Sequence, residues 1–140
     1  MRVNYKRVAV IFMVSIVLTS IALGGKSVIQ VPSSYMSLFY TVVSVVFSVC
    51  MGVACSLNIG RVKNDEIYIV IKNSSLMVRD TSICLFVCVT LFWILATAAD
   101  CYWMTSFFYS FSLVSLLYFV LNFKTIQDLN YEIEDRSRNI

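Results

Sequence analysis

Long apolar stretches without any Asp, Glu, Lys or Arg dominate the chain. They cover residues 8–25, 27–60, 81–99 and 101–123. About 20 apolar residues of α-helix cross the roughly 30 Å hydrocarbon core of a membrane. Membrane-spanning strands would instead alternate polar and apolar residues over about ten positions. The pattern therefore predicts an all-α polytopic membrane protein, a four-transmembrane-helix bundle.

The expected organisation is a transmembrane domain over residues 1–123 and a separate C-terminal segment over 124–140. We expect spans at 8–23, 34–59, 81–99 and 102–123, of which the second is the longest. The loops at 24–33 and around Asp100 are short, so the last two spans should form an antiparallel hairpin. Within the longer loop 60–80, the β-branched run 67–71 predicts a short strand, with a helical extension of span two as the alternative. Asn73–Ser75 is then a turn, or the N-cap of span three.

The polar segment after Phe123 has a helical pattern. Ile126, Leu129 and Ile133 recur at helical spacing, while Asp128, Glu132 and Asp135 occupy the other faces. This predicts an amphipathic helix that continues span four. It is either a simple extension that packs within the protein or a docking site for a soluble partner.

Basic residues are divided unequally between the two sides of the predicted spans. Lys26 is the only one on one side; the other ten are Arg2, Lys6, Arg7, Arg61, Lys63, Lys72, Arg79, Lys124, Arg136 and Arg138. Lys and Arg are enriched in cytoplasmic segments, which places both termini and residues 60–80 in the cytoplasm of a bacterial inner membrane. Seven of the ten are expected near the lipid headgroups, where they fix topology and bind anionic lipid: Arg2, Lys6, Arg7, Arg61, Lys63, Arg79 and Lys124. Residues 1–24 also resemble a signal peptide, but we expect them to remain as the first span.

Composition excludes several function classes. The chain is 59% hydrophobic and 14% charged, and it has no His; soluble domains average about 25% charged. Ion-coupled transporters need ionisable groups inside their spans, and all eight acidic residues lie in predicted loops or tails. The five cysteines lack metal-site spacing. The sequence thus predicts no catalytic, cofactor-binding or metal-binding residue and no direct contact with nucleic acid.

Small and hydroxylated residues mark one face of span two. They are spaced by three or four positions: Ser37, Thr41, Ser44, Ser48, Gly52 and Ser56. Small residues allow helices to approach closely, and hydroxyls bond across helices. The stripe serves packing within the bundle, a homo-oligomer (tetramer or dimer), or a hydroxyl-lined pore. On span four, Tyr109 and Tyr118 lie deep in the membrane and should find hydrogen-bond partners, for which nearby serines could serve.

The four uncharged runs and the placement of Lys and Arg resemble two families of small prokaryotic inner-membrane proteins. One is the membrane subunit of the Kiwa anti-phage system, which works with a soluble cytoplasmic DNA-binding partner. The other is the immunity proteins against pore-forming colicins. The Kiwa-like interpretation is favoured because residues 60–80 and 124–140 would lie where a soluble partner binds. It implies a non-enzymatic sensor or scaffold; the alternatives are a small oligomeric channel and a colicin immunity protein.

Overall fold

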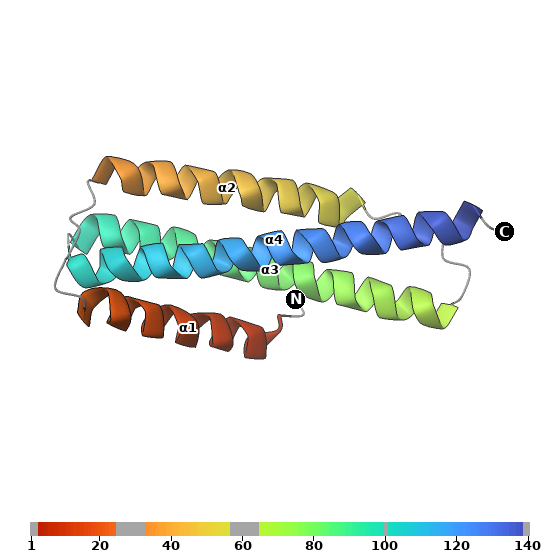
Figure 1. Ribbon diagram of the computed structural model, residues 1–140, viewed down its shortest axis with the longest axis horizontal. Helices are drawn as coiled ribbons and strands as arrows, with labels where there is room; N and C mark the ends of the chain where they lie inside the picture. Colours follow the sequence, from red (N-terminus) through yellow and green to blue (C-terminus); the bar gives the residue numbers. More distant parts are fainter. Residues whose placement is uncertain (1–2, 25–32, 57–64, 100, 139–140) are drawn as a thin grey trace.

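The computed structural model describes residues 3–24, 33–56, 65–99 and 101–138. They form four α-helices, each long and apolar enough to cross a membrane, which confirms the predicted fold class. The helices are α1 (Tyr5–Gly24), α2 (Ser33–Ser56), α3 (Asp65–Ala99) and α4 (Tyr102–Arg138). They alternate in direction, so α1 and α3 begin at the end of the bundle where α2 and α4 finish (Figure 1). We call this the basic end, because α1 begins there with Lys6 and Arg7.

Helix α4 is the centre of the bundle. It packs against each of the other three helices, and α1 and α2 lie on opposite sides of it (Figure 1). Helix α1 touches α3 only slightly, so it is held mainly by α4. Helix α2 buries the smallest share of its surface among the four. In a membrane, α2 therefore offers the most surface to lipid or to another subunit.

Aromatic side chains fill the spaces between the helices. Phe111 on α4 is fully buried. Its ring centroid lies 4.8 Å from that of Phe12 on α1 and 5.4 Å from that of Phe92 on α3. These ring contacts join α4 to both helices. On the other side, Phe47 and Phe86 stack at 4.2 Å between α2 and α3. Lipid tails are as apolar as these rings, so close packing rather than exclusion from water stabilises the contacts.

Hydroxyl groups within the apolar helices mostly bond to their own helix. Ser15 and Thr19 on α1 donate to the carbonyls four residues earlier, both at 2.7 Å. Thr97 on α3 does the same at 2.8 Å. This back-bonding satisfies each hydroxyl without a partner helix, which is why so many serines and threonines are tolerated in the spans.

The prediction that residues 60–80 form a loop is wrong for residues 65–80. Helix α3 begins at Asp65, so the run 67–71 is helical and extends span three, neither a strand nor an extension of span two. Asn73–Ser75 lies inside the helix, and α3 and α4, rather than α2, are the longest helices. Helix propensities differ by less than about 1 kcal/mol between ordinary residues, too little to end a helix that is packed further along. Residues 57–64 lie outside the described residues.

The predicted arrangement of the last two spans is confirmed. Helix α3 ends at Ala99 and α4 begins at Tyr102, antiparallel to it. Asp100, within the turn, lies outside the described residues, as do residues 25–32 of the first loop. The continuation of span four is also confirmed, because α4 runs without a break to Arg138.

Candidate functional site at the basic end

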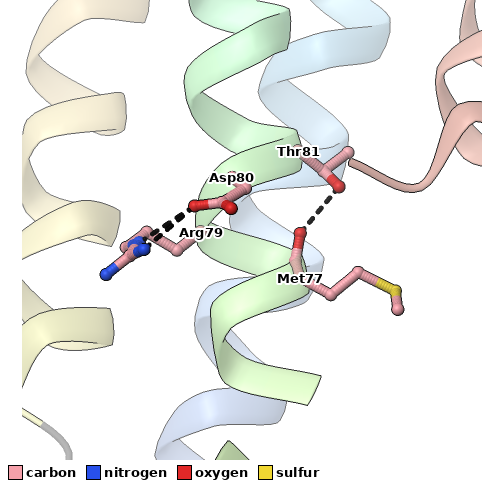
Figure 2. Close-up of polar contacts among 4 residues, drawn as sticks. All are labelled: Met77, Arg79, Asp80 and Thr81. Carbon is pink, nitrogen blue, oxygen red and sulfur yellow. Dashed lines mark hydrogen bonds and ion pairs between the residues drawn. The ribbon is translucent and has the colours of Figure 1, made fainter. Parts of the chain in front are cut away.

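Asn4 fixes the start of α1 beside the middle of α3. Its side-chain Oδ1 accepts a hydrogen bond from the backbone N–H of Arg7 at 3.2 Å, the geometry of a helix N-cap. The backbone N–H of Asn4 donates to Thr81 Oγ1 at 3.0 Å. The Thr81 hydroxyl in turn donates to the carbonyl of Met77 at 2.7 Å (Figure 2). Thr81 is fully buried, so this junction sets the level at which α1 enters the bundle.

Helices α3 and α4 project well past that level (Figure 1). Asp65 precedes Thr81 by 16 residues of helix, which is about 24 Å at 1.5 Å per residue. On α4, Asn122 lines the same small cavity as Ser82 of α3, so Asn122 lies close to the level of the junction. Arg138, the last residue of α4, is 16 residues further along. The projecting part of α4 is therefore also about 24 Å long. The basic end thus carries two helical projections.

Arg79 and Asp80 form an ion pair just below the junction (Figure 2). Arg79 Nε and Nη2 both donate to Asp80 Oδ1, at 3.2 and 3.0 Å. Arg79 also lines a cavity with Met51 and Ala54, near the last turns of α2, where backbone carbonyls carry partial negative charge. Asp80 is only 8% exposed. The prediction that Asp80 lies in a loop is wrong, because Asp80 is inside α3.

The predicted partner-binding residues of α4 are not equally accessible. Ile126 is 7% exposed and lines a cavity with Cys50 and Phe119, so in this structure it packs within the subunit. Leu129 and Ile133 are half-buried. Asp128 is exposed, and the side chains of Glu132 and Asp135 lie outside the described residues. The interpretation of this segment as packing within the protein therefore holds for Ile126.

A small notch separates the end of α2 from α4. Its volume is about 190 Å³. The lining residues are Val53, Ser56, Ile126, Gln127, Asn130 and Tyr131. Apart from Ile126, the α4 residues that line the notch are polar or amphipathic, so the surface beside the buried Ile126 offers hydrogen-bonding groups as well as one exposed aromatic ring.

The small-residue stripe of α2 faces away from the bundle. Ser37, Thr41, Ser48, Gly52 and Ser56 are exposed, and Ser44 is half-buried. The stripe therefore does not pack against the other helices of the same subunit. Whether it joins copies of the chain or lines a pore between them stays a prediction.

Gly52→Leu provides a selective test of oligomerisation. A Cβ added at Gly52 meets no atom within 4 Å, so the substitution should leave the fold of the subunit unchanged. It should block close approach of a second copy and reduce the oligomer to smaller species in native mass spectrometry. Val45→Leu, at an exposed position of the same face that already carries a large side chain, adds only one methylene group there and is the matched control. Equal oligomer distributions for both variants would contradict an interface at this stripe.

The basic residues predicted at the headgroups are described in part. Lys6 and Arg7 are exposed on the first turn of α1, and Lys124 is exposed on α4 just beyond Asn122. Arg79 is the exception, since it is paired with Asp80. Arg2, Arg61 and Lys63 lie outside the described residues.

The polar groups inside the bundle are mainly hydroxyls and thiols of the described helices. Among the described residues, no group of three or more Cys, Asp and Glu side chains is placed to hold a metal ion. The hydroxyls of Tyr109 and Tyr118 are buried without a hydrogen-bond partner, as are those of Ser112 and Ser115. The prediction that these tyrosines find hydrogen-bond partners is therefore wrong. Ser112 and Ser115 lie three residues from Tyr109 and Tyr118, respectively, on the same helix, but no hydrogen bond joins them.

Comparisons with known proteins bring no relative to this chain: no family model, no curated protein and no solved structure matches it.

Proposed function

We propose that this chain is a multi-pass protein of a bacterial inner membrane, with its basic end in the cytoplasm, and that it is a non-enzymatic scaffold recruiting a soluble protein. Helix α1 supports the membrane assignment, since its 20 residues span about 30 Å, the thickness of the hydrocarbon core. Ten of the eleven basic residues on one side support the orientation.

The projecting ends of α3 and α4 carry the proposal. In this orientation they extend about 24 Å beyond the start of α1 and into water. Ile69 and Val70 on α3 are 55% and 64% exposed there, and Tyr131 on α4 is 67% exposed. Exposed apolar side chains that adjoin one another, as Ile69 and Val70 do, mark protein-binding surfaces when they form a patch. Tyr is enriched among the residues that dominate binding energy.

Polar neighbours on α4 suit the edge of such an interface. Asp128 and Asn130 are exposed on either side of the half-buried Leu129. Interfaces typically combine a few apolar or aromatic anchors with a polar rim. The partner we propose is therefore a soluble cytoplasmic protein that covers Tyr131 and forms hydrogen bonds around it.

The biological setting we propose is anti-phage defence, as in the Kiwa system. Outward-facing small residues on α2 support a homo-oligomer, which would present several pairs of projecting helices on one membrane patch. Assembly would raise the local number of docking sites and so strengthen recruitment without any new contact.

Tyr131→Asp tests recruitment. It removes the exposed aromatic side chain and should cost about 2 kcal/mol or more of binding energy, roughly thirtyfold in affinity. Asn130→Asp adds the same charge at the neighbouring exposed position and is the matched control. The measurement is co-purification of the protein encoded by the adjacent gene, with membrane levels of each variant held equal. Full retention with Tyr131→Asp, and with a chain ending at Asn130, would exclude α4 as the docking element.

A channel between subunits is the second candidate. The exposed hydroxyls of Ser37, Thr41 and Ser48 favour it, because a weakly polar face of α2 can line a path only between copies of the chain. Conductance of the purified protein in planar bilayers would favour the channel over the scaffold.

A further inference from the structure

An open groove of about 470 Å³ lies along one face of α3 at the basic end. The residues that line it are Tyr68, Ile69, Lys72, Asn73, Leu76, Arg79 and Asp80. They recur every three or four positions, so they share one side of the helix. The groove begins at Asp80, next to the junction residue Thr81, and runs away from the apolar half of the bundle.

The groove presents two cations with restricted positions. Lys72 Nζ lies 5.5 Å from the ring centroid of Tyr68, a cation–π contact. Among the described residues, no carboxylate forms an ion pair with Lys72. Arg79 uses Nε and Nη2 on the nearly buried Asp80, which orients the guanidinium and leaves its other N–H groups available. Two cations and one carboxylate give the lining a net charge of +1.

The position of the groove relative to the membrane narrows the choice of anion. Further along the same side of α3, Val87 and Leu91 are exposed apolar residues within the segment that would face acyl chains. Arg79 and Asp80 lie next to the level at which α1 begins, where the hydrocarbon ends if α1 spans the membrane. One side of α3 therefore passes from a surface for acyl chains to a cationic groove at the depth of lipid phosphates.

We propose that this groove is a binding site for the phosphate of an anionic phospholipid. Arg79 donates to the phosphate oxygens from the orientation that Asp80 imposes. Lys72, about two helical turns further from the apolar half of the bundle, adds a second positive charge that attracts the anionic headgroup. The acyl chains lie along Val87 and Leu91. The site does not depend on recruitment of a soluble partner.

Native mass spectrometry of the purified full chain tests the site with phosphatidylglycerol and phosphatidylcholine of identical acyl chains. Phosphatidylglycerol should be retained preferentially. A basic residue near an anionic surface contributes about 1 kcal/mol, so Lys72→Ala should weaken phosphatidylglycerol retention about fivefold. Arg79→Lys should weaken it as well, because it keeps the charge and loses the planar fork of donors. Lys124→Ala removes an exposed cation of α4 that is expected at the headgroups but lies outside the groove. It is the matched control for general attraction of basic residues to anionic lipid and should weaken retention less than Lys72→Ala.

Helical content measured by circular dichroism shows whether each variant is folded. A competition experiment then identifies the source of the phosphate. Inorganic phosphate at millimolar concentration should not displace the lipid. Its binding in place of phosphatidylglycerol would reassign the groove to a soluble phosphate. Equal retention of the two lipids, or equal effects of Lys72→Ala and Lys124→Ala, would overturn the proposal. Loss of the soluble partner from Lys72→Ala with lipid retention unchanged would assign the groove to a protein instead.

Discussion

Ile126→Asp is expected to destabilise the basic end of the bundle, not merely to release a partner. Ile126 is 7% exposed and lies beside Cys50, Phe119 and Phe123. Losing the packing of a buried Ile costs about 2–5 kcal/mol, and the carboxylate adds the cost of leaving water without a compensating partner. The expected result is a lower unfolding temperature of the purified protein and a lower amount in the membrane.

Thr125→Asp is the matched control for this prediction. Thr125 precedes Ile126 and is exposed, so the same charge is added on the same helix without entering the interior. Thermal unfolding of both variants in the same detergent gives the comparison. A stable Ile126→Asp variant that has lost only its soluble partner would show that Ile126 is a surface residue, contrary to the structure.

Phe111→Ala is expected to detach α1 from the rest of the bundle. Phe111 is fully buried, and its ring contacts those of Phe12 on α1, Phe92 on α3 and Phe107 on its own helix, at 4.8, 5.4 and 5.9 Å. In soluble proteins, truncation of a core Phe to Ala costs about 3–5 kcal/mol, from the lost transfer out of water and from the cavity left behind. In lipid the cavity and its lost packing contacts remain. Since α1 is held mainly by α4, no other helix replaces the lost contacts.

The control for Phe111→Ala is Leu113→Ala, at a half-exposed position on the outer surface of α4. Unfolding monitored by circular dichroism should show a large loss of stability for Phe111→Ala and a small one for Leu113→Ala. Similar losses for both variants would mean that the aromatic contacts do not hold α1 in place.

The apolar half of the fold could be predicted from sequence because charge placement alone delimits it. The predicted spans 8–23 and 34–59 match α1 and α2 to within three residues at each end, and the start of α4 was predicted at the correct residue. A helix in lipid needs a continuous apolar run, and such a run is visible without any tertiary information.

The polar half could not be predicted in the same way. Lys72, Arg79 and Asp80 made residues 60–80 resemble a loop, although these residues are compatible with a helix whenever neighbouring segments hold it. The contact that fixes the helix is the bond from Asn4 to Thr81, between residues 77 positions apart. The exposure of Gly52 and the burial of Ile126 likewise depend on which helices pack against α2 and α4. The spacing of residues along one helix does not reveal its neighbours.

Single-cysteine labelling is the most direct test of the central claim that the basic end lies in the cytoplasm. One variant keeps only the exposed native Cys101; the other carries Val70→Cys, on the projecting part of α3, with all five native cysteines replaced. A membrane-impermeant maleimide is added to intact cells and to permeabilised cells. The predicted result is that Cys101 is labelled in intact cells and Val70→Cys only after permeabilisation. Labelling of Val70→Cys in intact cells would contradict the orientation and, with it, the recruitment of a cytoplasmic protein.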